Sequence, residues 1–138
     1  MGSWEHFEHE ADIGVRGYGH NMAEAFEQAA LAMTAIITEP ASIRPESMIG
    51  LSRFELDPEL LFVDWLNAIV YEMSTRHMLF CRFELRIEEG HLEAQLFGEI
   101  IDPQRHEPAV EVKGATYTAL SIERDKDGAW RGQCVVDV

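Results

Sequence analysis

Residues 57–96 read DPELLFVDWLNAIVYEMSTRHMLFCRFELRIEEGHLEAQL, and this stretch decides the fold because the spacing of its apolar side chains changes partway along it. Asp57 and Pro58 are typical of a helix start, since aspartate caps the free amides and proline suits the first helical position. Apolar residues then recur at helical spacing to about Arg76: Leu61, Phe62, Trp65, Leu66, Ile69 and Met73. Beyond them, apolar residues alternate with charged ones in two runs separated by Glu89-Gly90. The stretch predicts a helix followed by an antiparallel hairpin with one face in water.

The sequence on either side of this stretch completes the pattern. The other predicted elements are, in chain order, one or two strands within 4–18, an amphipathic helix at 22–37, a strand at 48–56, and a second hairpin with strands near 110–122 and 130–138. This order lacks the regular strand–helix–strand alternation of a parallel sheet. We therefore predict an α+β fold, a mostly antiparallel sheet covered by two amphipathic helices, with residues 1–138 as a single domain.

The charge of the chain restricts its partners. The 11 Lys and Arg residues stand against 25 Asp and Glu residues, which leaves a net charge of −14. Such a surface repels phosphate backbones and anionic lipid headgroups, so we expect neither stable direct nucleic-acid binding nor a membrane partner. A cation or a basic protein suits it better.

The cysteines and the N-terminal sequence favour the cytoplasm. Cys81 and Cys134 are the two cysteines, and neither has a CxxC partner, so we expect two reduced thiols in place of a zinc or redox site. No charged segment followed by an apolar run precedes Trp4, as it would in a secretory leader.

Familiar catalytic motifs are absent from the sequence: GxSxG, the Walker lysine loop, HExxH and GxGxxG do not occur. What remains is a set of carboxylates. Asp12 follows His6, His9 and Glu10, and Asp137 stands next to Val138, whose terminal carboxylate a preceding strand would hold in place. Oxygen ligands at this density are what Ca²⁺, Mg²⁺ or Mn²⁺ select. The plainer alternative is a strand end in water.

A second unusual pair lies in the predicted strand 110–122. With Val110 and Val112 on one face, Glu111 and Lys113 point to the other. They could form a surface ion pair, worth about 0 to 1 kcal/mol. They could also belong to a recognition or phosphate-contacting patch.

Motifs spread along the chain resemble those of the archease family. They are WEHFEHEADIG at 4–14, AEAFEQAA at 23–30, LLFVDWLN at 60–67, Gly98-Glu99 with Asp102, His106, EVK at 111–113 with Thr116-Tyr117, and Asp137 followed by an aliphatic residue. The family usually reads H-T-A-D-I-G near its start, and Glu10 replaces the threonine here.

The resemblance implies a specific function. Archeases are small metal-binding proteins, not enzymes themselves, that assist an RtcB-type RNA ligase, which joins RNA 3′-phosphate or 2′,3′-cyclic-phosphate ends to 5′-hydroxyl ends. They promote guanylylation and multiple turnover of that ligase in tRNA splicing and RNA repair. The metal ligands implied for this chain are Asp12, Asp137 and the carboxylate of Val138, with Ca²⁺ as the expected ion and Mg²⁺ or Mn²⁺ as alternatives. Glu111 and Lys113 match the region implied in ligase activation.

Two other classes of function stay open. A metal-dependent hydrolase could use Asp12 and Asp137 to hold an ion that activates water, although no general base stands near an evident pocket. A chaperone-like interaction module is the other. Turnover of phosphoesters by the protein alone would favour the hydrolase, and suppression of aggregation of unrelated proteins would favour the chaperone.

Overall fold

The strands of the chain form two antiparallel sheets in the computed structural model, which describes residues 2–138. Sheet A has the order β1-β2-β8-β6, with β7 also paired to β8: β1 Ser3–His9, β2 Asp12–Gly19, β6 Gly114–Ala115, β7 Ser121–Arg124 and β8 Trp130–Asp137. Sheet B has the order β3-β5-β4: β3 Ser47–Phe54, β4 Met78–Glu88 and β5 His91–Ile100. The predicted α+β class and antiparallel pairing are confirmed, and the strands divide between two sheets.

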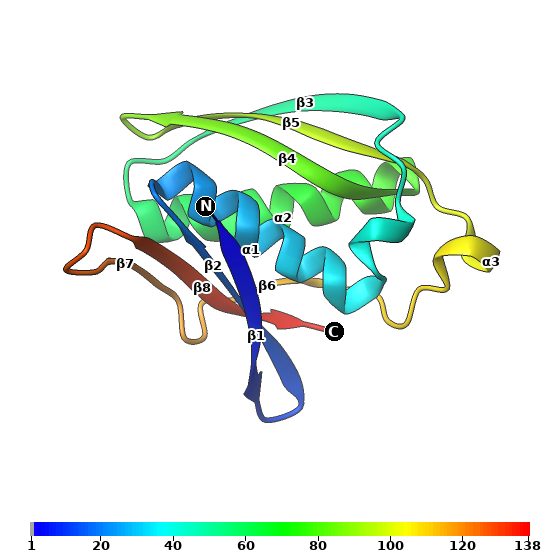
Figure 1. Cartoon of the computed structure of the whole chain (residues 1–138), viewed down its shortest axis with the longest axis horizontal. Coiled ribbons are helices and arrows are strands. Elements are labelled where there is room, and N and C mark those ends of the chain that lie inside the picture. The colour runs from blue at the N-terminus through cyan, green and yellow to red at the C-terminus, as the bar shows by residue number, and fades with distance from the viewer. Residues whose placement is uncertain (1) are drawn as a thin grey trace.

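Two long helices, α1 Met22–Ile37 and α2 Pro58–Arg76, lie between these sheets (Figure 1). The 3-10 turn η1 Pro40–Ser42 and the short helix α3 Pro103–His106 lie toward one end of the molecule. Because the helices have a sheet on either side, three of their aromatic side chains are fully buried: Phe26, Phe62 and Trp65. No helix within residues 2–138 combines the length and apolar character needed to cross a bilayer.

Local signals set the bounds of α1, and both predicted bounds are confirmed. The Asn21 side chain accepts a hydrogen bond from the Glu24 amide at 2.8 Å, which satisfies one free donor of the first turn. The helix packs closely on β2 because Gly17 faces it. A Cβ atom at Gly17 would lie 2.2 Å from the Ala25 carbonyl oxygen, so only glycine permits this approach.

The start of α2 is also the predicted one. Asp57 accepts hydrogen bonds from the Glu59 and Leu60 amides, and Pro58 occupies the first turn. The helix ends at His77, whose φ of 55° lies in the left-handed region. The β4–β5 hairpin then follows, with its turn at Glu89-Gly90 as predicted.

The predicted strand 110–122 is wrong. Residues 107–113 are irregular, β6 contains only Gly114–Ala115, and β7 begins at Ser121. The reason is a turn in which Ala119 has a φ of 55° and the Thr118 carbonyl accepts from the Val135 amide. Val112 is buried as its parity predicted, but Val110 is 40% exposed.

Candidate metal site and partner patch

Strand pairing brings Asp12 and Asp137 together. Ile13 pairs with Val136 in the antiparallel β2–β8 ladder, so Asp12 and Asp137 occupy the next register position. Directly opposite residues in such a ladder have their Cβ atoms about 5 Å apart. The two predicted side-chain ligands are therefore neighbours, one from each end of the sequence.

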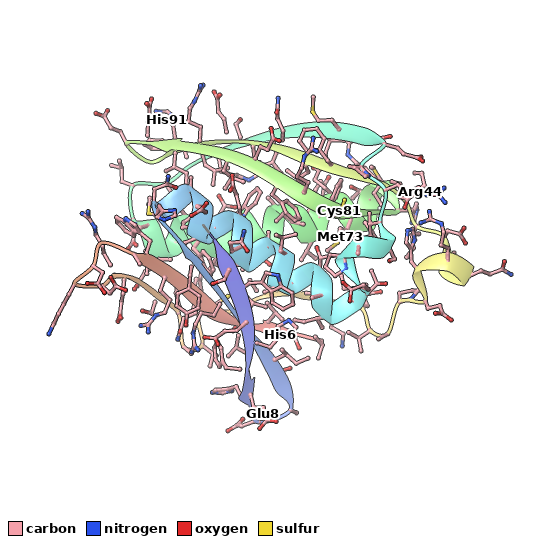
Figure 2. The ribbon with its side chains drawn as sticks, viewed as in Figure 1. His6, Glu8, Arg44, Met73, Cys81 and His91 are labelled. Carbon is pink, nitrogen blue, oxygen red and sulfur yellow. The ribbon has the colours of Figure 1, made fainter. Side chains whose placement is uncertain are left out.

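Both carboxylates lie on the outer face of sheet A. Val15 and Gly17 of β2 face the helices, so by strand alternation Asp12 points the other way. Asp137 lies opposite Asp12 and shares its face, where it is exposed. His9 is the register partner of Asp12 across the β1–β2 hairpin. His6 points the opposite way, with its Nε2 atom 2.7 Å from the Ala32 carbonyl oxygen of α1 (Figure 2).

Arg16 is the cation that shares this face of β2, and it is held by other groups. Its guanidinium donates to the Glu5 carboxylate at 2.8 Å and to the Gln133 side-chain carbonyl at 2.7 Å. It also stacks over the Phe7 ring, with its central carbon 4.6 Å from the ring centroid. Hydrogen bonds from Tyr18 and then Arg16 lower the pKa of Glu5 below its ordinary value.

The Phe7 ring lies across Gly14, between the positions of Arg16 and Asp12 along β2. A Cβ atom at Gly14 would lie 2.2 Å from the ring. Within residues 2–138, no side-chain hydrogen bond or ion pair forms at either Asp12 or Asp137. Two adjacent carboxylates thus keep their oxygens available.

The end of β8 is anchored. The Lys113 amide donates to the Asp137 carbonyl oxygen at 2.8 Å, and the Val138 side chain packs against the core. These contacts fix the positions of Asp137 and Val138 at the end of the strand. Among residues 2–138 no three His, Cys, Asp or Glu side chains gather into a metal-binding group. The donor set of two aspartates and a main-chain carboxylate is all oxygen, which fits a hard cation such as Ca²⁺.

Glu111 and Lys113 lie close to this strand end. Both are exposed, and in the described part of the chain they form no ion pair with each other or with another residue. The surface ion pair considered from the sequence is therefore not formed. Strand β8 pairs with β2 on one side and with β6 on the other. The predicted metal ligands and the Glu111–Lys113 pair therefore lie at the same end of sheet A. This meeting follows from strand pairing, which the sequence pattern did not reveal.

A buried polar cluster holds the segment that leads to Glu111; its members Glu99 and His106 were noted in the sequence as parts of family motifs, but their contact was not predicted. The Glu99 carboxylate is 7% exposed and accepts from the Arg44 amide at 2.7 Å and the Arg105 guanidinium at 2.6 Å. Figure 2 shows Arg44 on the same side of the molecule as α3. The Arg105 hydrogen bond is the main reason that the pKa of Glu99 falls from 4.5 to about 2, although burial acts to raise it.

The proton on His106 is assigned by its neighbours. Its Nδ1 atom accepts from the Asp102 amide at 2.8 Å, because an amide can only donate. The proton of the neutral ring is then on Nε2, which donates to Glu99 at 2.9 Å. The sequence signal for this cluster was the set of motif residues Glu99, Asp102 and His106, which helical and strand periodicity do not connect.

Known proteins share this architecture. The solution structure of protein 1598 of Methanobacterium thermoautotrophicum superposes with a TM-score of 0.85, is 30% identical in sequence, and is matched over 99% of both chains. The chain is thus a small α+β protein in which two helices lie between antiparallel sheets, with a pair of aspartates at one strand end.

The family is shown by sequence comparison. The model described as "Archease protein family (MTH1598/TM1083)" matches residues 4–138. Proteins named "Protein archease" from Pyrococcus furiosus and Thermococcus kodakarensis are 39% and 37% identical, over the full length of both chains in each case. The chain belongs to the archease family.

Proposed function

We propose that this chain is an accessory protein of an RtcB-type RNA ligase, which joins 3′-phosphate or 2′,3′-cyclic-phosphate RNA ends to 5′-hydroxyl ends. The observation that carries the proposal is the meeting of Asp12 and Asp137 beside Lys113, with all three side chains free of partners in residues 2–138. Family membership supports it, since the family match spans residues 4–138 and therefore covers these positions. The chain itself makes or breaks no RNA bond in this proposal.

The metal ligands are Asp12, Asp137 and the carboxylate of Val138. A bound divalent ion, Ca²⁺ first and Mg²⁺ or Mn²⁺ as alternatives, supplies positive charge at an otherwise acidic strand end. The protein's own contribution is to hold the carboxylates adjacent and to keep Arg16 away from them. The ladder between β2 and β8 and the Lys113–Asp137 backbone bond do this.

Glu111 and Lys113 contact the ligase. Binding stabilises the ligase conformation that accepts GMP, so guanylylation and multiple turnover both increase. The net charge of −14 favours a basic surface on the partner and opposes direct binding of RNA. The setting is tRNA splicing or RNA repair in the cytoplasm.

The test is ligation by the cognate ligase with GTP, a divalent metal and RNA, with and without this protein. We expect substoichiometric amounts to raise both the rate and the number of turnovers. The ligase–GMP intermediate should accumulate faster before RNA is added. Equal rates of guanylylation and unchanged turnover would contradict the proposal, and phosphoester hydrolysis by the protein alone would favour a hydrolase.

A further inference from the structure

A groove of about 700 Å³ lies between the C-terminal half of α2 and the segment 108–113. Its wall is largely apolar and comes from three parts of the chain: Val70, Met73, Met78, Ile101, Val110 and Val112. Met73 is labelled in Figure 2. Glu111 and Lys113 also line this groove, so it is continuous with the patch assigned above to the ligase.

The backbone beside the groove has unused hydrogen-bonding groups. The segment is tied at its ends, where the Ala109 amide donates to the Ile37 carbonyl at 2.8 Å and the Lys113 amide donates to Asp137. Between these ties, Val110, Glu111 and Val112 form no backbone hydrogen bond with the rest of residues 2–138. An irregular segment of this kind, held at both ends and unpaired between, is a template for an added strand.

Side chains along the segment are arranged for recognition. Val112 is buried and fixes the segment on the core, whereas Val110 is 40% exposed at the groove. Glu111 and Lys113 flank Val112 and carry opposite charges without partners. A ligand that fits this arrangement carries three groups. They are an apolar side chain for the groove, a basic group that faces Glu111 and an acidic group that faces Lys113.

We propose that an extended stretch of the ligase docks in this groove, pairs with the exposed backbone of Val110 and Glu111 and inserts one apolar side chain against Val110 and Met73. This inference rests on the proposed function and adds the element of the partner that is recognised. A second copy of this chain suits the groove less well, since two molecules of net charge −14 repel each other.

The first test is binding of the cognate ligase to Val110→Glu, measured by titration calorimetry. We expect at least tenfold weaker binding, because the variant places a charge in the apolar wall beside Glu111. Tyr71→Glu is the matched control: Tyr71 is 61% exposed on α2, outside the groove, and the change in charge is the same. Tyr71→Glu should bind within twofold of wild type, and both variants should melt near the wild-type temperature.

The second test is amide hydrogen exchange of the full-length protein, free and in the complex. Amides of Val110 and Glu111 should exchange fast in the free protein and at least tenfold more slowly in the complex. If wild-type protein stimulates the ligase while Val110→Glu binds normally and these amides stay unprotected, the groove is not the docking site and the proposed function stands. If wild-type protein gives no stimulation, the proposed function itself fails. Protection of the same amides without ligase, together with self-association in sedimentation, would assign the groove to a second copy and overturn the inference.

Discussion

The surroundings of Asp12 explain why this half-buried acid has no ion pair within residues 2–138 although Arg16 lies on the same strand. Phe7 occupies the space over Gly14, and Arg16 is drawn toward Glu5 and Gln133 by hydrogen bonds. A carboxylate in this position gains no stabilisation from a protein cation. Its oxygens therefore stay available for a bound ion.

Asp12→Asn should weaken Ca²⁺ binding by at least about tenfold, which corresponds to about 1.4 kcal/mol. The substitution keeps the size of the side chain and removes one of the charged ligands. Titration calorimetry measures the change, with Glu10→Gln as control because Glu10 is an exposed acid in the adjacent turn. Equal affinity of wild type and Asp12→Asn would remove Asp12 from the metal site.

Gly14→Ala should lower the free energy of unfolding by about 1 to 3 kcal/mol, since the new methyl group overlaps the Phe7 ring and displaces it. Gly50→Ala is the matched control. A Cβ atom at Gly50 on β3 meets nothing nearer than the Ala94 carbonyl oxygen at 3.8 Å, so its stability should change little. Chemical denaturation of both variants measures the free energy of unfolding. A similar loss of stability in both would show that overlap with Phe7 is not the cause.

The segment 107–113 forms fewer backbone hydrogen bonds than the strands around it. It is positioned by α3 at one end and by β8 at the other, and its exposed charged side chains have no structural partners. Such side chains are expected to serve binding more than folding.

Glu111→Ala and Lys113→Ala should each change the free energy of unfolding by less than about 0.5 kcal/mol. Under the proposed function each should nevertheless reduce stimulation of the ligase, because the lost charge belongs to the proposed contact with the partner. Thermal unfolding and ligation turnover, measured on the same preparations, test both statements. A marked drop in melting temperature with normal stimulation would assign the pair a structural role.

The cluster that anchors α3 should make stability depend on pH in acid. The folded-state pKa of Glu99 is about 2, below its ordinary 4.5, so the ionised form stabilises the fold. This contribution is fully present above about pH 4.5 and is lost as the pH falls toward 2. Denaturation at several pH values should show the loss in wild type, and Glu99→Gln should lack this part of the pH dependence.

Glu99→Gln should also cost about 1.5 to 3 kcal/mol at neutral pH, since hydrogen bonds to a charged group are lost. Glu93→Gln on the same strand is the matched control, because Glu93 is exposed and paired with Arg86 at the surface. If the two variants show equal stability and equal pH dependence, Glu99 does not anchor this region.

Much of the fold could be predicted because its signals are local. Asn21 begins α1, Asp57-Pro58 begins α2, and Glu89-Gly90 turns the hairpin, each within a few residues of its effect. The division into two sheets could not be predicted, since β2 pairs with β8 across almost the whole chain. Alternation tells which face a residue occupies but not which strand lies beside it.

The same distinction applies to the candidate site. Motif resemblance implied Asp12 and Asp137 as ligands of one metal ion, and the β2–β8 register supplies the physical reason why they are neighbours. The strand predicted through residues 110–122 failed because long-range bonds to Val135 and the left-handed turn at Ala119 interrupt it. The contact between Glu99 and His106 was not predicted for a related reason: the members of this cluster come from β5, α3 and the loop before β3, and no periodic pattern connects them.

Strand β8 lies in the middle of sheet A although it is the last strand in the sequence (Figure 1). During synthesis, β2 emerges from the ribosome early and has only β1 to pair with until the final strand follows. Contacts so far apart in sequence form slowly, since the intervening chain must first be brought together. Sheet A therefore closes after translation has reached the end of β8, and in a nascent chain Asp12 and Asp137 are not yet neighbours, however much of the helical layer has already formed.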